Sequence, residues 1–169
     1  MNAHLAEWNC ASETEALDTM VACCGARRWA ERMVALRPLG NIVALSEAAD
    51  RVWSTMKEAD WMEAFACHPR IGERKAAHAT AQSMAWSRQE QASASGAVER
   101  VLNELAEGNA MYEHRFGFTY IVCATGKSAE EMLGILKRRL TNDREAELHE
   151  AAEQQRQITQ IRLGKWLTS

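Results

Sequence analysis

His68 is the residue whose type and position in this sequence best suit proton transfer. Imidazole is the only side chain with an ordinary pKa near neutral pH, so it can both accept and donate a proton there. In the segment Cys67-His68-Pro69, the proline disfavours helical geometry at His68 and predicts a turn just beyond a helix end. We therefore expect His68 to be either a catalytic acid or base, or a turn histidine with its ring in water.

Glu90 is the carboxylate that could work with such a histidine. It lies three residues after Ser87, the spacing of a capping box in which the two side chains bind the backbone of a helix start. This structural role explains the spacing by itself. A helix start at Ser87 would also present N–H donors and the positive end of the helix dipole to an anionic substrate group. The residues alone leave both interpretations open.

Metal, nucleotide and thiol chemistry have less support. The five histidines show no HExxH spacing and no cysteine partner at zinc-ligand distance, which argues against a metal. The chain contains neither GxGxxG nor GxxxxGK[ST], so no phosphate-binding loop is predicted. Cys67 is better explained as a buried, inert cysteine than as a nucleophile, because sequential neighbours usually point apart.

Helices are the elements that must position these groups. Alanine outnumbers valine and isoleucine together, and the chain has only 2 Pro and 9 Gly, a composition that favours helix over strand. The spacing of Ser and Glu marks helix starts at Ser12, Ser87 and Ser128. Apolar periodicity predicts an all-α bundle of about seven to nine helices, including segments near 12–25, 27–37, 42–56, 59–66, 87–114, 128–140 and 143–163.

Two segments stand apart from this pattern. Residues 73–86 have no clear period and predict a long surface connection, which is often functional. Aromatic and β-branched residues are enriched only near 116–124, where we expect at most a short extended segment. That segment is either an apolar insert into the core, the simpler interpretation, or a strip whose peptide groups bind a planar heterocycle.

Length and composition limit the classes of protein. The chain has 169 residues, 47% hydrophobic and 25% charged, with a net charge of −3, which predicts a single globular domain over residues 1–169. No basic stripe suits nucleic acid, and no apolar stretch is long enough to cross a membrane. An odd number of cysteines without CxxC, and no basic-then-apolar leader, predict a cytoplasmic protein.

Taken in order, these pieces resemble one family, the 2-oxo-4-hydroxy-4-carboxy-5-ureidoimidazoline (OHCU) decarboxylases of urate degradation. The matching segments are residues 65–72, 87–91, 116–124, 126–128, 139–142 and 161–163. An HPxIG followed about 20 residues later by SxxEQ, and then by FGFxxIVCA, is a specific combination, although each piece alone is weak.

The resemblance implies an all-helical fold, usually a homodimer, that converts OHCU to (S)-allantoin with loss of CO₂ and without a metal or organic cofactor. It implies that His68 is the catalytic acid/base and that Glu90 is its carboxylate partner. The residues that it implies for substrate binding are Pro69, Ser87, Gln91, Ile121, Val122, Cys123, Ala124 and Thr125. No cofactor is needed, because the electron pair left by CO₂ spreads into the substrate's own ring system.

One position departs from the family pattern. Some members carry Arg where this chain has Thr125, and that Arg is a candidate for binding the substrate carboxylate. Arg70, Lys127 or the N–H groups of a helix start could take its place here.

Two other functions compete with the enzyme. A non-enzymatic, all-helical protein-interaction module is the main alternative, because amphipathic helices would serve it equally well. A helical DNA-binding regulator is disfavoured by the net charge and by the lack of a basic recognition helix.

Overall fold

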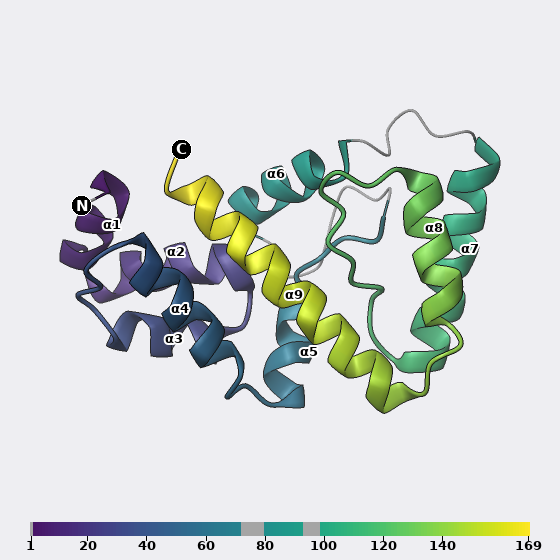
Figure 1. Ribbon diagram of the computed structural model, residues 1–169, viewed down its shortest axis with the longest axis horizontal. Helices are drawn as coiled ribbons and strands as arrows, with labels where there is room; N and C mark the ends of the chain where they lie inside the picture. Colours follow the sequence, from purple (N-terminus) through teal and green to yellow (C-terminus); the bar gives the residue numbers. More distant parts are fainter. Residues whose placement is uncertain (1, 72–79, 93–98) are drawn as a thin grey trace. The chain divides into compact units, whose positions relative to one another are not determined.

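The chain folds into helices joined by irregular segments (Figure 1). The structure is a computed structural model that describes residues 2–71, 80–92 and 99–169. Within these residues there are nine helices and no strand, which confirms the all-α prediction. The helices are α1 (Ala3–Cys10), α2 (Glu13–Cys24), α3 (Arg27–Ala35), α4 (Ile42–Trp53), α5 (Glu58–Ala66), α6 (Ala81–Glu90), α7 (Glu99–Phe116), α8 (Ala129–Arg139) and α9 (Arg144–Trp166).

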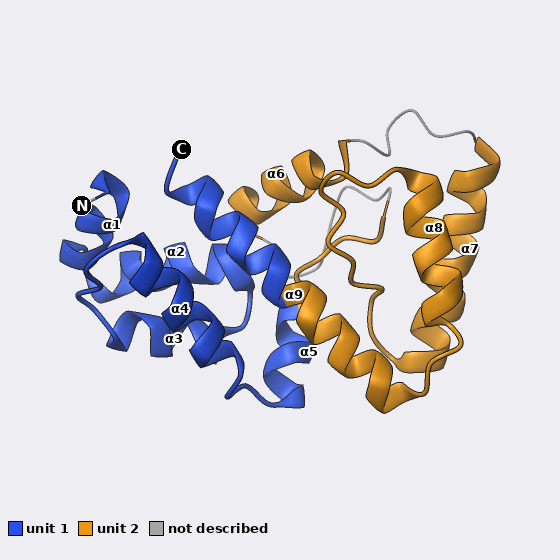
Figure 2. Cartoon of the chain, viewed as in Figure 1, with its two compact units in different colours: residues 1–64, 156–169 blue, residues 65–155 orange. Residues whose placement is uncertain are grey.

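Contacts between residues in space divide the chain into two compact units (Figure 2). Unit 1 comprises residues 1–64 and 156–169, and unit 2 comprises residues 65–155. Helix α9 supplies residues to both units, because the boundary falls after Gln155. The single domain over residues 1–169 remains a prediction.

Capping explains where two of the predicted helices begin. Ser12 and Ser128 each form a complete capping box, in which the serine side chain binds the third helical residue and the glutamate there binds back. These boxes confirm the predicted starts of α2 and α8. Helix α2 ends at Gly25, whose φ of 90° lies in the left-handed region that glycine adopts readily.

The helix start predicted at Ser87 is wrong. Helix α6 begins at Ala81, because the Thr80 side chain accepts a hydrogen bond from the N–H of Ser83 at 3.1 Å and caps the helix there. Ser87 and Glu90 lie in the last turns of α6, close to its C-cap Gln91. Residues three apart also share a helix face, and that accounts for their spacing. No helix-start anion site therefore exists at Ser87.

The neighbouring segments also differ from the prediction. The prediction of an irregular connection over residues 73–86 is wrong from Ala81 onward, where α6 forms. Residues 73–79 lie outside the described residues. Helix α7 starts at Glu99 as a separate helix instead of continuing from Ser87, and Gly96 lies outside the described residues. Helix α1 was not predicted, although Asn2 caps it by accepting from the N–H of Leu5.

Unit 1 is built on tryptophan packing. Trp29 of α3 is fully buried, and its Nε1 donates to the carbonyl of Ala49 on α4 at 3.1 Å. The rings of Trp8 and Trp166 meet edge to face with centroids 6.2 Å apart. No helix within the described residues is long and apolar enough to span a membrane.

Unit 2 buries an aromatic cluster that includes the irregular segment after α7. The ring centroid of Phe118 lies 5.3 Å from that of Phe65 and 5.6 Å from that of Tyr112. Tyr112 also contacts Tyr120 at 5.4 Å, and such distances are favourable for aromatic pairs. The aromatic side chains of this segment are therefore part of the core, as the simpler interpretation predicts.

Candidate active site

Every residue predicted for the site lies in unit 2, on three separate elements. His68 and Pro69 follow α5, while Ser87, Glu90 and Gln91 form the end of α6. The third element is the strip, which we define as residues 121–125 between α7 and α8.

His68 lies on the predicted turn. Helix α5 ends at Ala66, and the N–H of His68 donates to the carbonyl of Phe65 at 3.1 Å. Pro69 is buried and His68 is half-buried. The Nε2 atom of His68 lies 2.7 Å from Oε1 of Gln155 on α9. The protein therefore holds the imidazole in place, and the ring is not simply surrounded by water.

Arg70 ties the same turn to α7. Its Nε donates to Oε1 of Glu113 at 2.7 Å, and its Nη2 donates to Oε2 at 2.5 Å. A bidentate pair of this kind fixes orientation as well as distance. The guanidinium proposed for the substrate carboxylate is thus engaged in anchoring the His68 turn.

Glu90 shares a buried face of α6 with Ser83 and Ser87. The exposed fractions of these three residues are only 7%, 3% and 3%. Burial penalises a carboxylate, and the negative end of the helix dipole gives it no help at this C-terminal turn. Packing alone would favour an apolar residue here, so Glu90 keeps its place as a functional candidate. Its contact with the His68 ring stays a prediction.

The strip is held through its peptide groups. The N–H of Cys123 donates to Oε1 of Gln154 at 2.8 Å, and the Cys123 carbonyl accepts from Nζ of Lys127 at 2.8 Å. The carbonyl of Ile121 accepts from Nη1 of Arg139 at 2.5 Å. A planar ligand would have to use other peptide groups of the strip or displace these side chains.

Side chains of the strip are mostly inaccessible. Those of Ile121, Val122, Cys123 and Ala124 are buried, with exposed fractions of 1% to 6%. Thr125 is exposed, at the turn that leads to α8. Contacts of the first four residues with a ligand would therefore be made through the backbone.

A fully buried ion pair supports the strip from α8 and α9. The Nε of Arg139 donates to Oε1 of Glu147 at 2.7 Å, and both side chains are 0% exposed. The Tyr112 hydroxyl also donates to Glu147. Burial alone would lower the pKa of Arg139, but its hydrogen bond with Glu147 and the neighbouring groups raise that pKa above its usual value. Arg139 is therefore charged while it holds the Ile121 carbonyl.

Burial also shifts the pKa values of the two tyrosines in this cluster, Tyr112 and Tyr120. It raises the pKa of Tyr112 and that of Tyr120 above the usual value for tyrosine, and the nearby guanidinium of Arg139 only partly opposes the effect. The hydroxyl of Tyr120 donates to the Met132 carbonyl at 3.0 Å. Both phenols are thus neutral donors at physiological pH.

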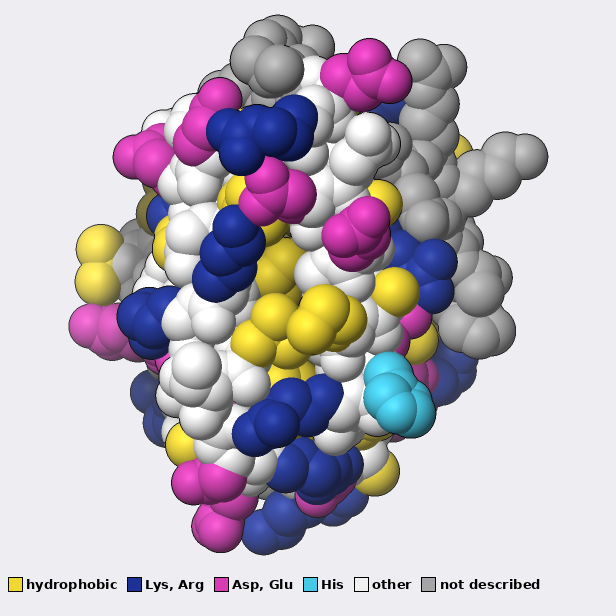
Figure 3. Space-filling view, turned by 90° about the vertical axis from the view of Figure 1, so that its right-hand side faces the viewer, with side chains coloured by type: hydrophobic (Ala, Val, Ile, Leu, Met, Phe, Trp, Pro, Cys, Tyr) yellow, Lys and Arg dark blue, Asp and Glu magenta, His cyan; other side chains and the backbone are white. Residues whose placement is uncertain are grey.

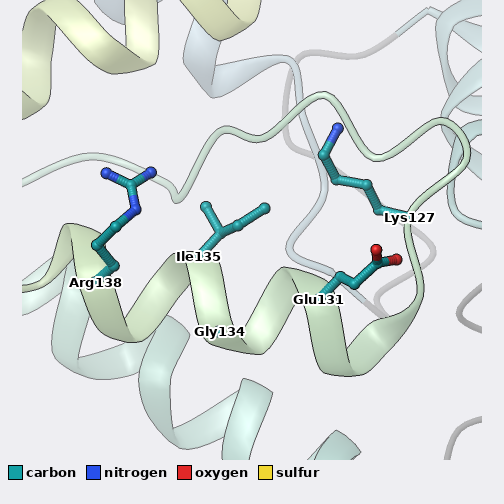
Figure 4. A pocket seen from close by; sticks show the side chains of 5 residues that line it. All are labelled: Lys127, Glu131, Gly134, Ile135 and Arg138. Carbon is teal, nitrogen blue, oxygen red and sulfur yellow. The ribbon is translucent and has the colours of Figure 1, made fainter.

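Lys127 is the cation next to the strip. It lines a pocket of about 350 Å³ beside α8, together with Glu131, Gly134, Ile135 and Arg138. Figure 4 shows the longer of these side chains projecting to the same side of α8. The ammonium group of Lys127 donates one hydrogen bond to the Cys123 carbonyl. Arg138 is paired with Glu150 at 2.9 Å, whereas Lys127 is the cation that directly contacts the strip.

A second, smaller pocket lies between α7 and α8. Its volume is about 200 Å³, and none of the predicted site residues lines it. Figure 3 shows hydrophobic side chains gathered among charged ones on the side of the molecule that carries these two helices. This pocket is separate from the three elements of the candidate site.

Cys67 is buried, as its interpretation as an inert cysteine predicts. Among the residues that the structure describes, no group of three or more His, Cys, Asp or Glu side chains is arranged to hold a metal ion.

Sequence patterns did not single out Gln154 and Gln155, the residues through which α9 contacts the strip and His68. A signal was nevertheless present at Gln155. It stands between Ala151 and Ile158 in the apolar stripe of α9, and a polar side chain in a buried stripe needs a hydrogen-bond partner. The stripe indicates that a partner exists but not which residue it is.

Comparison with known proteins identifies related sequences and structures. A family profile described as OHCU decarboxylase matches residues 9–164. "Uric acid degradation bifunctional protein TTL" of Arabidopsis thaliana is 36% identical over 149 residues, which are 88% of this chain and 46% of that protein. This chain therefore spans about half the length of that relative.

Two further relatives match over most of their own length. "2-oxo-4-hydroxy-4-carboxy-5-ureidoimidazoline decarboxylase" of Amia calva is 30% identical over 131 residues, covering 75% of this chain and 73% of that protein. A crystal structure described as OHCU decarboxylase in the presence of (S)-allantoin is 34% identical, with a TM-score of 0.77. The match covers 90% of this chain and 99% of that one.

Proposed function

The chain belongs to the OHCU decarboxylase family, and on this basis we propose that it converts OHCU to (S)-allantoin and CO₂. The observation that carries the proposal is the placement of His68 and Pro69, the first two residues of the family-like HPxIG motif. Its histidine lies on a turn, half-buried, with the ring bound by Gln155 at 2.7 Å. This is a suitable setting for a proton-transfer group that must be oriented and still reach a small molecule.

In the proposed reaction, the bond between C4 and the carboxylate carbon of OHCU breaks. CO₂ leaves, and the bonding electron pair spreads into the adjacent ring C=N or carbonyl system, so the substrate acts as its own electron sink. One proton is then added at carbon. His68, with Glu90 as its carboxylate partner, transfers the proton, while Ser87 and Gln91 hold the polar edge of the ring. Delivery to one face of the ring gives a single enantiomer.

Lys127 is our candidate for the substrate carboxylate. It follows the exposed Thr125 by two residues, and its Nζ is held over the strip by the Cys123 carbonyl. Pro69 and the strip 121–125 would supply the walls and backbone contacts for the planar ring. Charge-assisted hydrogen bonds from an ammonium to a carboxylate are among the stronger polar contacts in proteins.

The assembly and the location are further predictions. A homodimer would be checked by light scattering on the purified protein, and a cytoplasmic location by fractionation of the cells that make it.

The proposal is tested by following circular dichroism at the allantoin band. OHCU is generated in place from urate with urate oxidase and 5-hydroxyisourate hydrolase, with and without this protein. We expect rapid growth of a one-handed allantoin signal when the protein is present. A signal that follows only the slow racemic background would reject the decarboxylase and favour the interaction module.

A further inference from the structure

Gln155 contacts the imidazole of His68 from a distant part of the sequence. It lies on α9, 87 positions from His68, and its Oε1 is 2.7 Å from Nε2 of the ring. The Gln155 side chain is 0% exposed. A buried amide without partners costs about 1–3 kcal/mol, so packing alone would favour an apolar residue like the neighbouring Ala151 and Ile158.

This contact determines which ring nitrogen carries hydrogen. An amide oxygen has no hydrogen and can only accept, so the Nε2 that faces it must be the donor. In the neutral ring Nδ1 then holds the lone pair and is the atom that can take up a proton. The bidentate pair of Arg70 and Glu113 anchors the turn itself. His68 is therefore held at its backbone by the turn and at Nε2 of its ring by Gln155.

We propose that Gln155 is the positioning residue for His68, holding Nε2 so that Nδ1 exchanges the proton with the substrate. The substrate in this inference rests on the proposed function, whereas the contact does not. Uptake of a proton at Nδ1 produces an imidazolium, whose Nε2–H bond to Gln155 becomes charge-assisted and stronger. Return of that proton to the substrate carbon restores the neutral ring.

Among its described residues, the turn carries one charged side chain, Arg70, which is bound to Glu113 on α7. Glu90 on α6 is the carboxylate that the proposed function assigns to His68. A substitution at position 155 leaves Arg70, Glu113 and Glu90 unchanged, so a change in the titration of His68 between variants reports on the contact with that position.

The contact is tested first by NMR titration of the histidine rings, without any substrate. The His68 resonance is assigned by its absence from His68→Ala, and Gln155→Glu is compared with Gln82→Glu, at an exposed position on α6. A carboxylate in place of the amide should raise the pKa of His68 by about 1 to 3 units, because it stabilises the imidazolium. Equal titration of His68 in the two folded variants would overturn the proposal.

The role in catalysis is tested by the separate effects on kcat and KM. Gln155→Leu should lower kcat by up to about 10²-fold through misplacement of the ring, with KM little changed. Gln155→Glu keeps an oxygen acceptor and should retain more of kcat than the leucine variant. Far-UV circular dichroism verifies that each variant is folded, and the glutamate variant alone suffices if the leucine variant is not.

The outcomes separate this inference from the proposed function. Full kcat in a folded Gln155→Leu protein would refute the positioning role. Failure of the wild-type protein to decarboxylate OHCU would refute the proposed function and with it the catalytic role, while the titration would still decide whether Gln155 holds the ring.

Discussion

Lys127 is the residue that we propose as the ligand of the substrate carboxylate. Thr125 is exposed and uncharged. Two residues later, Lys127 is held by the Cys123 carbonyl at 2.8 Å, next to the strip. In the proposed function, the carboxylate of OHCU would therefore meet an ammonium group beside the strip.

Removal of this ammonium should weaken substrate binding. Lys127→Met loses a charge-assisted contact worth about 1.5–3 kcal/mol, which corresponds to a rise in KM of roughly 10- to 100-fold. Steady-state rates with OHCU measure the change. Lys137→Met, at an exposed position on α8 paired with Glu104, is the matched control and should leave KM unchanged. Equal KM values for the two variants would exclude Lys127 as the carboxylate ligand.

Single residues were predictable from the sequence where their role is local. Pro69 correctly predicted the turn at His68, because proline restricts the residue directly before it. The partner of His68 was not predictable, because Gln155 is 87 positions away and no local pattern reports a contact at that separation. For the same reason, the hydrogen bond from the N–H of Cys123 to the Gln154 side chain was not predictable.

At the level of elements, helices α7, α8 and α9 meet at a buried charge. Arg139 and Glu147 are 0% exposed and bonded to each other, and Tyr112 donates to the same carboxylate. Arg139 also reaches the Ile121 carbonyl, so the ion pair joins these three helices to the strip. A buried pair of this kind is strongly destabilising to break, although it is not itself strong evidence of stability.

Removal of one member of the buried ion pair should therefore lower the free energy of unfolding more than replacement of both members by apolar residues. Arg139→Met leaves the Glu147 carboxylate buried and unpaired, and should lower the free energy of unfolding by about 3–5 kcal/mol. The double variant Arg139→Met/Glu147→Leu should recover most of that loss, because two apolar side chains leave no buried charge. Urea unfolding measures both. A single variant as stable as the wild type, or a double variant no better than the single, would contradict this role.

Helix starts illustrate how far sequence reasoning reaches at this scale. Ser12 and Ser128 cap their helices as predicted, but the identical spacing at Ser87 does not mark a start. Thr80 caps α6 instead, and Ser87 and Glu90 share a face near its end. Spacing alone cannot separate a capping box from a shared face, because both place the two residues three apart.

At the scale of the whole molecule, the burial of ionisable groups makes the free energy of unfolding depend on pH in the alkaline range. Burial raises the pKa of Tyr112 and Tyr120 in unit 2, and it raises the pKa of Cys23 in unit 1 to about 12. The folded state keeps these protons at pH values where the unfolded chain releases them. The stabilisation is complete below the ordinary pKa values and is lost as the pH rises through the shifted ones.

The free energy of unfolding should consequently fall above about pH 9, where a cysteine thiol in the unfolded chain begins to ionise, and more steeply above about pH 10. Each group contributes up to about 1.4 kcal/mol per pH unit. Tyr120→Phe should make the decline above about pH 10 shallower, because it removes one of the buried groups that hold a proton in the folded state. Identical slopes for the tyrosine variant and the wild type would show that burial of this phenol does not govern the decline.

Composition was sufficient to predict the all-α class, because helix propensity is a local property summed over the chain. The division into two units was not predictable, because it depends on contacts between residues far apart in sequence, including residues 156–169 with residues 1–64.

The most direct test of the central claim compares initial rates of (S)-allantoin formation from OHCU. Wild-type protein, His68→Ala and His114→Ala are measured side by side, the last being an exposed histidine at the end of α7. We predict that His68→Ala lowers the rate by about 10² to 10⁴ with its helical circular dichroism intact, while His114→Ala matches the wild type. A folded His68→Ala protein that forms (S)-allantoin at the wild-type rate would contradict the account.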